Sequence, residues 1–315
     1  MGHGKLKKFA ENETFRCLLQ PSASEVLADG FFNLRDHAVK GHWNEMMFDA
    51  PRPIVLELGC GKGEYTIDLA QRNPAFNYIG VDIKGARLWK GAKYATQHNL
   101  GNVAFLRTRI EFITAFFAPG EVSEIWLTFS DPQFRSENSR LTSPLFLERY
   151  RSFMKPGGIV HLKTDSMFLH RYSRAVAERN GLRILGCTED LYGTPREAFA
   201  PPAETPVGAC LLPETGLLPE AGLLPEAGLL PEAGLLPETV GALYEVQTFY
   251  EKMFLEQGYK ITYLSFVIDH DGPYEHPDFD EDYWRSVEGP RLLFGHDSAE
   301  TRRQKLHDSV EDLQK

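Results

Sequence analysis

Short apolar runs alternate with helix-like segments through the middle of this 315-residue chain, and this alternation constrains the fold most. Ile54–Leu58 is followed by a helical segment at 63–71, and Asn77–Asp82 by another at 84–98. Further strands are expected at 103–107, 124–129, 159–164 and 182–188, and further helices at 144–154 and 167–179. Continuous apolar strands separated by helices predict an α/β fold, a parallel sheet covered on both faces.

A tandem repeat interrupts this pattern. Residues 211–240 contain five copies of a hexapeptide of the form LLPEAG. A proline in every copy prevents a continuous regular helix, so we interpret 201–243 as a low-complexity insertion in a surface loop. A docking motif for a partner and a sortase-type signal at Leu212–Gly216 are weaker alternatives. A helix at 249–257 and a strand at 260–268 follow, which divides the chain into an N-terminal extension (1–49), a domain (50–268) and an acidic tail (269–315).

Charge is unevenly distributed along the chain. The net charge is −10, but residues 1–200 carry 26 basic and 22 acidic side chains (net +4), and residues 201–315 carry 8 and 22 (net −14). A nucleic-acid partner therefore remains compatible with the composition, because phosphates need only a locally basic face. We expect no membrane span, because no run of 18 apolar residues occurs, and no secretory signal.

Four widely spaced cysteines, Cys17, Cys60, Cys187 and Cys210, form no CxxC pair. We expect neither a zinc site nor a disulfide framework, and the cytoplasm is the simplest compartment. The His- and Asp-rich stretch at 269–282 is better interpreted as a solvated charged segment than as a metal site.

A glycine-rich loop follows the first strand and opens the first helix. Gly59, Gly61 and Gly63 would let the backbone approach a ligand, and Asp82 at the end of the second strand could accept the hydroxyls of a ribose. Together these residues predict an adenosine-type ligand. Glu57, just before the loop, would repel a pyrophosphate and favours a cationic ligand such as S-adenosylmethionine. Alternatively, Glu57 caps N–H groups of the loop.

Three more polar segments follow later strands or begin a helix. Asp131 lies in FSDPQ after the fourth strand, where the alternative is an Asx turn with proline. Asp165 lies in KTDS after the fifth strand, and Thr248–Glu251 (TFYE) also fits a helix capping box. Because carboxyl ends of parallel strands meet at one edge, the first two segments should lie near the cofactor crevice.

Six motifs in this order resemble the bacterial tRNA (guanine-N7-)-methyltransferase family. They are ELGCGKG (57–63), GVDIKG (80–85), TFSDP (128–132), RLT (140–142), LKTD (162–165) and TFYE (248–251). The resemblance implies a Rossmann-like class I methyltransferase fold, with a mostly parallel seven-stranded sheet and an antiparallel last strand. It also implies methyl transfer from S-adenosylmethionine to N7 of a guanosine in the tRNA variable loop.

The resemblance further implies a role for each matching residue. Glu57, the loop glycines and Asp82 would bind the cofactor, and Asp131 would serve both cofactor and target base as the catalytic residue. Arg135, Asp165, Thr248 and Glu251 would contact the substrate.

The chain departs from the family pattern at three places. The usual DPWPKK loop reads DPQFRS, its tryptophan is Gln133, and Arg109 replaces the acidic residue expected near the adenine. The adenine contact could then come from a backbone amide of Arg109 or Ile110.

RNA phosphates would be met by basic residues of the first 200 positions. Lys5, Lys7, Lys8, Arg135 and Arg140 are the candidates. Two other functions stay open on sequence alone: a methyltransferase of the same fold with another RNA, a protein or a small molecule as substrate, and a non-catalytic binding protein. Oligomeric state is not indicated by the sequence.

Overall fold

The computed structural model describes residues 3–28, 33–199 and 235–289 of the chain. The chain divides into two compact units, Met1–Phe279 and Asp280–Lys315. The described part of the second unit is α10 (Glu281–Glu288), which is capped by Asp280 through a 2.9 Å bond from the Tyr283 amide. No helix in the described ranges is long and apolar enough to cross a membrane.

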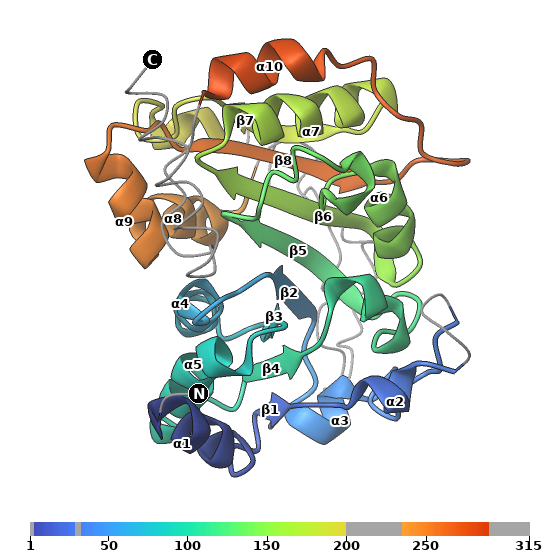
Figure 1. Ribbon diagram of the computed structural model, residues 1–315, viewed down its shortest axis with the longest axis vertical. Helices are drawn as coiled ribbons and strands as arrows, with labels where there is room; N and C mark the ends of the chain where they lie inside the picture. The colour runs from blue at the N-terminus through green and yellow to red at the C-terminus, as the bar shows by residue number, and fades with distance from the viewer. Residues whose placement is uncertain (1–2, 29–32, 200–234, 290–315) are drawn as a thin grey trace, which may run out of the picture. The chain divides into compact units, whose positions relative to one another are not determined.

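An eight-stranded sheet forms the centre of the first unit, in the order β1-β4-β3-β2-β5-β6-β8-β7 (Figure 1). Strands β1 to β6 pair in parallel, whereas β8 runs antiparallel to both β6 and β7. The predicted α/β class, mostly parallel with an antiparallel last strand, is confirmed, but the sheet has eight strands rather than seven because β1 adds to the edge beside β4. The strands are β1 (Leu18–Leu19), β2 (Ile54–Leu58), β3 (Asn77–Asp82), β4 (Val103–Arg107), β5 (Val122–Thr128), β6 (Met154–Thr164), β7 (Ile184–Thr188) and β8 (Thr262–Ile268).

Helices cover both faces of this sheet. Leu56 and Leu58 of β2 face a core that includes Trp43 and Phe146, and Val55 faces the opposite core with Leu69. Burial on both faces explains why β2 is apolar without alternation. The helices are α1 (His3–Asn12), α2 (Ala23–Val26), α3 (Trp43–Met47), α4 (Glu64–Arg72), α5 (Gly85–Gln97), α6 (Pro144–Arg151), α7 (Met167–Arg179), α8 (Pro237–Glu245) and α9 (Phe249–Glu256), with 3-10 turns η1 (Ile110–Ala115), η2 (Glu137–Ser139) and η3 (Arg196–Phe199).

The strand order reverses at β2, and this reversal positions the site. The chain leaves β2 through α4 to β3 on one side, while β5 pairs with β2 on the other side. Such a switch point opens a crevice at the carboxyl ends of the strands, where open α/β sheets bind their ligands.

Three parts of the fold were not predicted from the sequence. Helices α1, α2 and α3 and the edge strand β1 lie in the N-terminal extension, where no element was expected. Strand β6 begins at Met154 and is interrupted opposite β5, because Pro156–Gly158 form an irregularity within the strand. The fifth repeat copy, LLPETV at 235–240, begins α8: Pro237 opens the helix, and Leu235 and Val240 are buried. The first four copies lie outside the described residues.

Candidate active site at the carboxyl ends of the strands

The glycine loop between β2 and α4 has a left-handed backbone. Gly59, Gly61 and Gly63 have φ of 83°, 58° and 71°, a region that L side chains rarely adopt. A Cβ on Gly63 would also lie 2.5 Å from Phe105 Cε1. In contrast, no atom of the described residues lies within 4 Å of a Cβ built on Gly59 or Gly61, so the described part of the protein leaves this side of the loop open.

Glu57 is almost completely buried, 3% exposed, at the end of β2. Its Oε2 accepts bonds from the Thr66 amide (2.8 Å) and hydroxyl, and its Oε1 accepts from Thr128 Oγ1. Burial raises the pKa of Glu57 to about 7, and the threonine hydrogen bonds oppose this shift. The carboxyl group therefore ties β2 to the first turn of α4 and to β5. Its predicted contact with a cofactor stays a prediction.

Asp82 ends β3 directly beside the glycine loop. Its Oδ2 accepts from the Gly61 amide at 3.0 Å and its Oδ1 from the Lys84 amide at 2.7 Å. The fold thus brings the two halves of the predicted cofactor site together. Arg109, after β4, is exposed and pairs with Glu111 at 3.1 Å, so its guanidinium is directed to its own 3-10 turn.

Asp131 follows β5 in a strained turn. Phe129 and Gln133, on either side, have φ of 52° and 49°, and such non-glycine conformations cost about 1–3 kcal/mol each. Asp131 Oδ1 accepts from the Gln133 amide at 2.9 Å, so the predicted Asx turn is present, and the side chain is exposed. Ser130 Oγ is buried and has no hydrogen-bond partner in the described ranges. Strain of this kind is concentrated at functional sites.

Asp165 and the TFYE segment lie at the neighbouring strand ends. Asp165 directly follows β6 and is 8% exposed. Thr248 caps α9 by accepting from the Glu251 amide at 3.2 Å, which confirms this half of the capping box. The Phe249 amide donates to Glu64 Oε2 at 3.1 Å, and Lys62 lies over the Phe249 ring at 4.6 Å. The segment therefore adjoins the glycine loop.

The Glu251 side chain does not complete the capping box at Thr248 but forms a buried ion pair. Its Oε1 accepts from Lys163 Nζ at 2.8 Å and from the Tyr192 hydroxyl at 2.6 Å. Both charged side chains are fully buried, and Glu251 Oε2 has no hydrogen-bond partner among the described residues. Burial lowers the pKa of Lys163, and the Glu251 carboxylate opposes this shift.

Lys163 also holds the junction of α8 and α9. Its ammonium donates to the carbonyls of Leu243 (2.7 Å) and Val246 (3.2 Å) at the end of α8. Its own carbonyl accepts from the Phe129 amide at 2.9 Å, so it also joins the strained turn. Sequence reasoning included Lys163 in a motif but missed this role.

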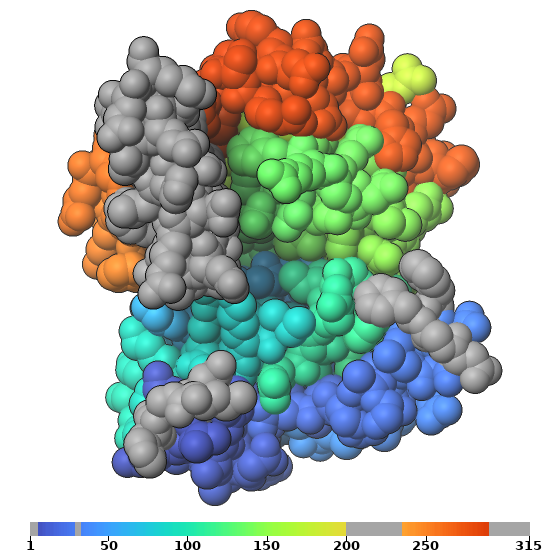
Figure 2. All heavy atoms as spheres, viewed as in Figure 1, coloured from blue at the N-terminus to red at the C-terminus, as the bar shows by residue number. Residues whose placement is uncertain are grey.

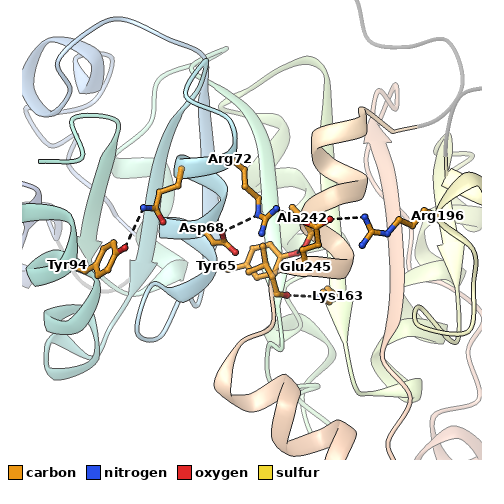
Figure 3. A network of polar contacts seen from close by, with 10 residues as sticks. Tyr65, Asp68, Arg72, Tyr94, Lys163, Arg196, Ala242 and Glu245 are labelled. Carbon is orange, nitrogen blue, oxygen red and sulfur yellow. Dashed lines mark hydrogen bonds and ion pairs between the residues drawn. The ribbon is translucent and has the colours of Figure 1, made fainter. Parts of the chain in front are cut away.

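Helix α8 is held on its outer side by a second network. Figure 3 shows Glu245 of α8 between Arg72 of α4 and Arg196, at 2.6 and 2.8 Å, with Lys163 nearby. The Tyr65 hydroxyl donates to the Ala242 carbonyl at 3.3 Å. These contacts fix the helix that leads into the TFYE segment.

The two arginines expected to meet RNA differ sharply. Arg135 is exposed after the strained turn, as a phosphate contact requires. Arg140 is fully buried, with its guanidinium 4.8 Å from the centre of the Phe168 ring and 4.4 Å from that of Tyr172. The expectation that Arg140 meets RNA phosphates is therefore wrong, because the guanidinium is packed against two aromatic rings inside the protein.

Comparison with known proteins identifies the family. Residues 51–205 match a family described as "Putative methyltransferase". The chain is 43% identical over 266 residues to a tRNA (guanine-N(7)-)-methyltransferase of Christiangramia forsetii, which covers 84% of this chain and 97% of the relative. The chain belongs to the tRNA (guanine-N(7)-)-methyltransferase family. The namesake of Bacteroides thetaiotaomicron is 40% identical, over 88% of this chain and 91% of its own length.

In this methyltransferase, most of the predicted site residues lie around one edge of the sheet. Glu57, the glycines and Asp82 lie at β2 and β3, and Asp131 and Asp165 follow β5 and β6. Thr66, Thr128, Lys163 and Tyr192 support them and were not foreseen. The TFSDP motif contains Thr128 and the LKTD motif contains Lys163, whereas no motif contains Thr66 or Tyr192.

Proposed function

We propose that this enzyme transfers a methyl group from S-adenosylmethionine to N7 of a guanosine in the variable loop of tRNA. The family relationship supports the reaction class, and the convergence of the glycine loop, Asp131 and TFYE at one sheet edge carries the assignment of the site. The cytoplasm is the proposed compartment. In keeping with it, Cys17, Cys60 and Cys187 are free thiols.

The residues around the glycine loop fit S-adenosylmethionine. The open side of Gly59 and Gly61 leaves room for a ligand against the backbone. Asp82 would accept the ribose hydroxyls, Glu57 and the loop would hold the amino-acid part, and the backbone at Arg109 would meet the adenine. When bound, this cofactor supplies an electrophilic methyl group on a sulfonium.

The chemistry asks for positioning rather than for a strong base. Guanine N7 carries an in-plane lone pair and no proton, so the new N7–carbon bond forms as the carbon–sulfur bond breaks, and no proton has to leave N7. The sulfonium becomes a neutral thioether and the base acquires the positive charge. The protein must therefore align N7 in line with the methyl group and stabilise the cation on the base.

Carboxylates at the sheet edge suit both tasks. The strained turn presents the Asp131 carboxylate to solvent, where it can meet both ligands. Asp165, 8% exposed, would accept hydrogen bonds from guanine N1–H and N2–H, whereas Glu251, fully buried in its ion pair with Lys163, would hold the start of α9 in place beside the base. Thr248 and Arg135 would contact the substrate around the base.

A modified transcript tests the target atom. A tRNA transcript made with 7-deazaguanosine has a C–H in place of N7 but keeps the Watson–Crick edge. We expect the unmodified transcript to accept the labelled methyl group and the 7-deaza transcript to bind with similar affinity but accept none. Equal methylation of both transcripts would exclude N7 as the acceptor. No methylation of either, with the cofactor bound, would favour another substrate.

A further inference from the structure

A continuous basic surface runs beside the site, on α1, α5 and the end of β4. We define it as the α1–α5 basic face, made of seven cationic residues: Lys7, Lys8, Lys84, Arg87, Lys90, Lys93 and Arg107. Residues 84–97 contain four of these cations and no acidic residue, although the whole chain carries a net charge of −10. A local excess of this kind concentrates positive potential that the total charge conceals.

Packing of α1 on α5 joins the cations into one surface. Trp89 Nε1 of α5 donates to Glu11 Oε2 of α1 at 2.7 Å, and Asn12 Nδ2 donates to the Gly85 carbonyl at 2.9 Å. Lys8 and Lys93 lie over the Trp89 ring at 4.6 and 4.8 Å. In Figure 2 the blue atoms of α1 adjoin the cyan-to-teal atoms of α5 on the visible face.

The face directly borders the cofactor residues. Lys84 caps α5 two residues after Asp82, and Arg107 is paired in register with Asp82. Arg107 Nε donates to the Ile83 carbonyl at 3.4 Å. Lys90 pairs at 2.9 Å with Glu64, the residue that also accepts from the amide of Phe249 in the TFYE segment. A polymer that lies along this face would therefore reach the site.

Within the described part of this face, Glu11 pairs with Lys7 (3.9 Å) and Lys93 (3.5 Å), and Glu64 pairs with Lys90. The four cations of residues 84–97, a stretch without an acidic residue, suit a polyanion. The Trp89 ring is partly buried under two lysines, so it supports cations rather than offering a stacking surface for a base.

We propose that the α1–α5 basic face binds the sugar–phosphate backbone of the RNA whose guanine is methylated. This proposal rests on the proposed function and adds the docking surface. Such contacts position the RNA without reading its sequence, and each phosphate neutralised contributes about 0.7–0.9 to the slope of log affinity against log salt.

Two triple variants of equal charge change test it. The face variant is Lys7→Gln, Lys84→Gln and Arg87→Gln, which spares every residue assigned to catalysis or cofactor binding. The control variant is Lys155→Gln, Arg179→Gln and Arg183→Gln, near the start of β6, the end of α7 and the start of β7, at the opposite edge of the sheet. Both lose three positive charges, so a general charge effect would weaken them equally.

The measurement is the tRNA dissociation constant between 50 and 300 mM KCl, with S-adenosylhomocysteine affinity as the control for folding. We expect the face variant to bind tRNA at least tenfold more weakly at low salt, with a salt slope reduced by about 2. Its KM for tRNA should rise while kcat at saturation stays near wild type, and the control variant should match wild type. Equal slopes for the two triple variants would overturn the proposal. If the wild type binds tRNA with the predicted slope but does not methylate it, the proposed function fails instead.

Discussion

The substitution Lys163→Met removes the cation that contacts the buried Glu251 carboxylate. Lys163 and Glu251 are each 0% exposed, so water cannot replace the lost partner. Breaking a buried pair in this way costs about 3–5 kcal/mol. The carbonyls of Leu243 and Val246 also lose a donor, which places the expected cost toward the upper end of this range.

Urea unfolding followed by far-UV circular dichroism measures this cost, with two matched variants. Lys163→Met combined with Glu251→Leu removes both charges and should recover most of the loss, because an apolar pair of similar volume is often as stable as a buried ion pair. Lys260→Met breaks a 2.8 Å pair with Asp190 in which the lysine is 66% exposed, and should cost far less than Lys163→Met because water replaces the lost partner. The reasoning is refuted if Lys163→Met costs no more than Lys260→Met, or if the double variant is as unstable as the single one.

Three further substitutions have defined outcomes. Burial raises the pKa of Glu57 to about 7, so the native protein keeps a proton that the unfolded chain loses near pH 4.5. The stability of the wild type relative to Glu57→Gln should therefore fall by up to about 3 kcal/mol as pH rises from 4.5 to 7.5. A pH-independent stability difference would contradict the raised pKa. Gly63→Ala combines positive φ with a contact to Phe105 and should cost about 2–4 kcal/mol in urea unfolding, against about 1 kcal/mol for Gly181→Ala, which has φ of 60° but no clash. Asp131→Asn can still accept from the Gln133 amide, so its melting temperature should match wild type while kcat/KM for tRNA falls roughly a hundredfold; a normal rate would remove Asp131 from the chemistry.

The central strands and the glycine loop could be predicted because the signals for them lie in short stretches of sequence. Strands β2, β3 and β4 were predicted at the residues where they occur, because each is a fully apolar or nearly apolar run bounded by turn residues. The glycine loop and Asp82 could be placed together because only one helix separates them. Helix α1 escaped prediction because its pairing with α5 depends on Glu11, Asn12 and Trp89, which are far apart in sequence.

The features that were not predicted depend on contacts between residues far apart in the sequence. No feature of the sequence around Lys163 indicates that its partner is Glu251, which lies beyond the repeat. Arg140 sits in a polar loop sequence typical of the surface, yet two rings from α7 enclose its guanidinium. The Glu57 carboxyl was expected to face a cofactor or the loop, whereas its bonds go to Thr66 and Thr128. Sequence position alone does not reveal which way such side chains turn.

The most direct test of the central claim is methyl transfer from labelled S-adenosylmethionine to bulk tRNA lacking 7-methylguanosine, with the labelled nucleoside identified by mass spectrometry. The site described here predicts label in 7-methylguanosine with the wild-type chain and roughly a hundredfold less with Asp131→Asn at equal cofactor occupancy. Label in any other nucleoside, or equal 7-methylguanosine from both proteins, would contradict it.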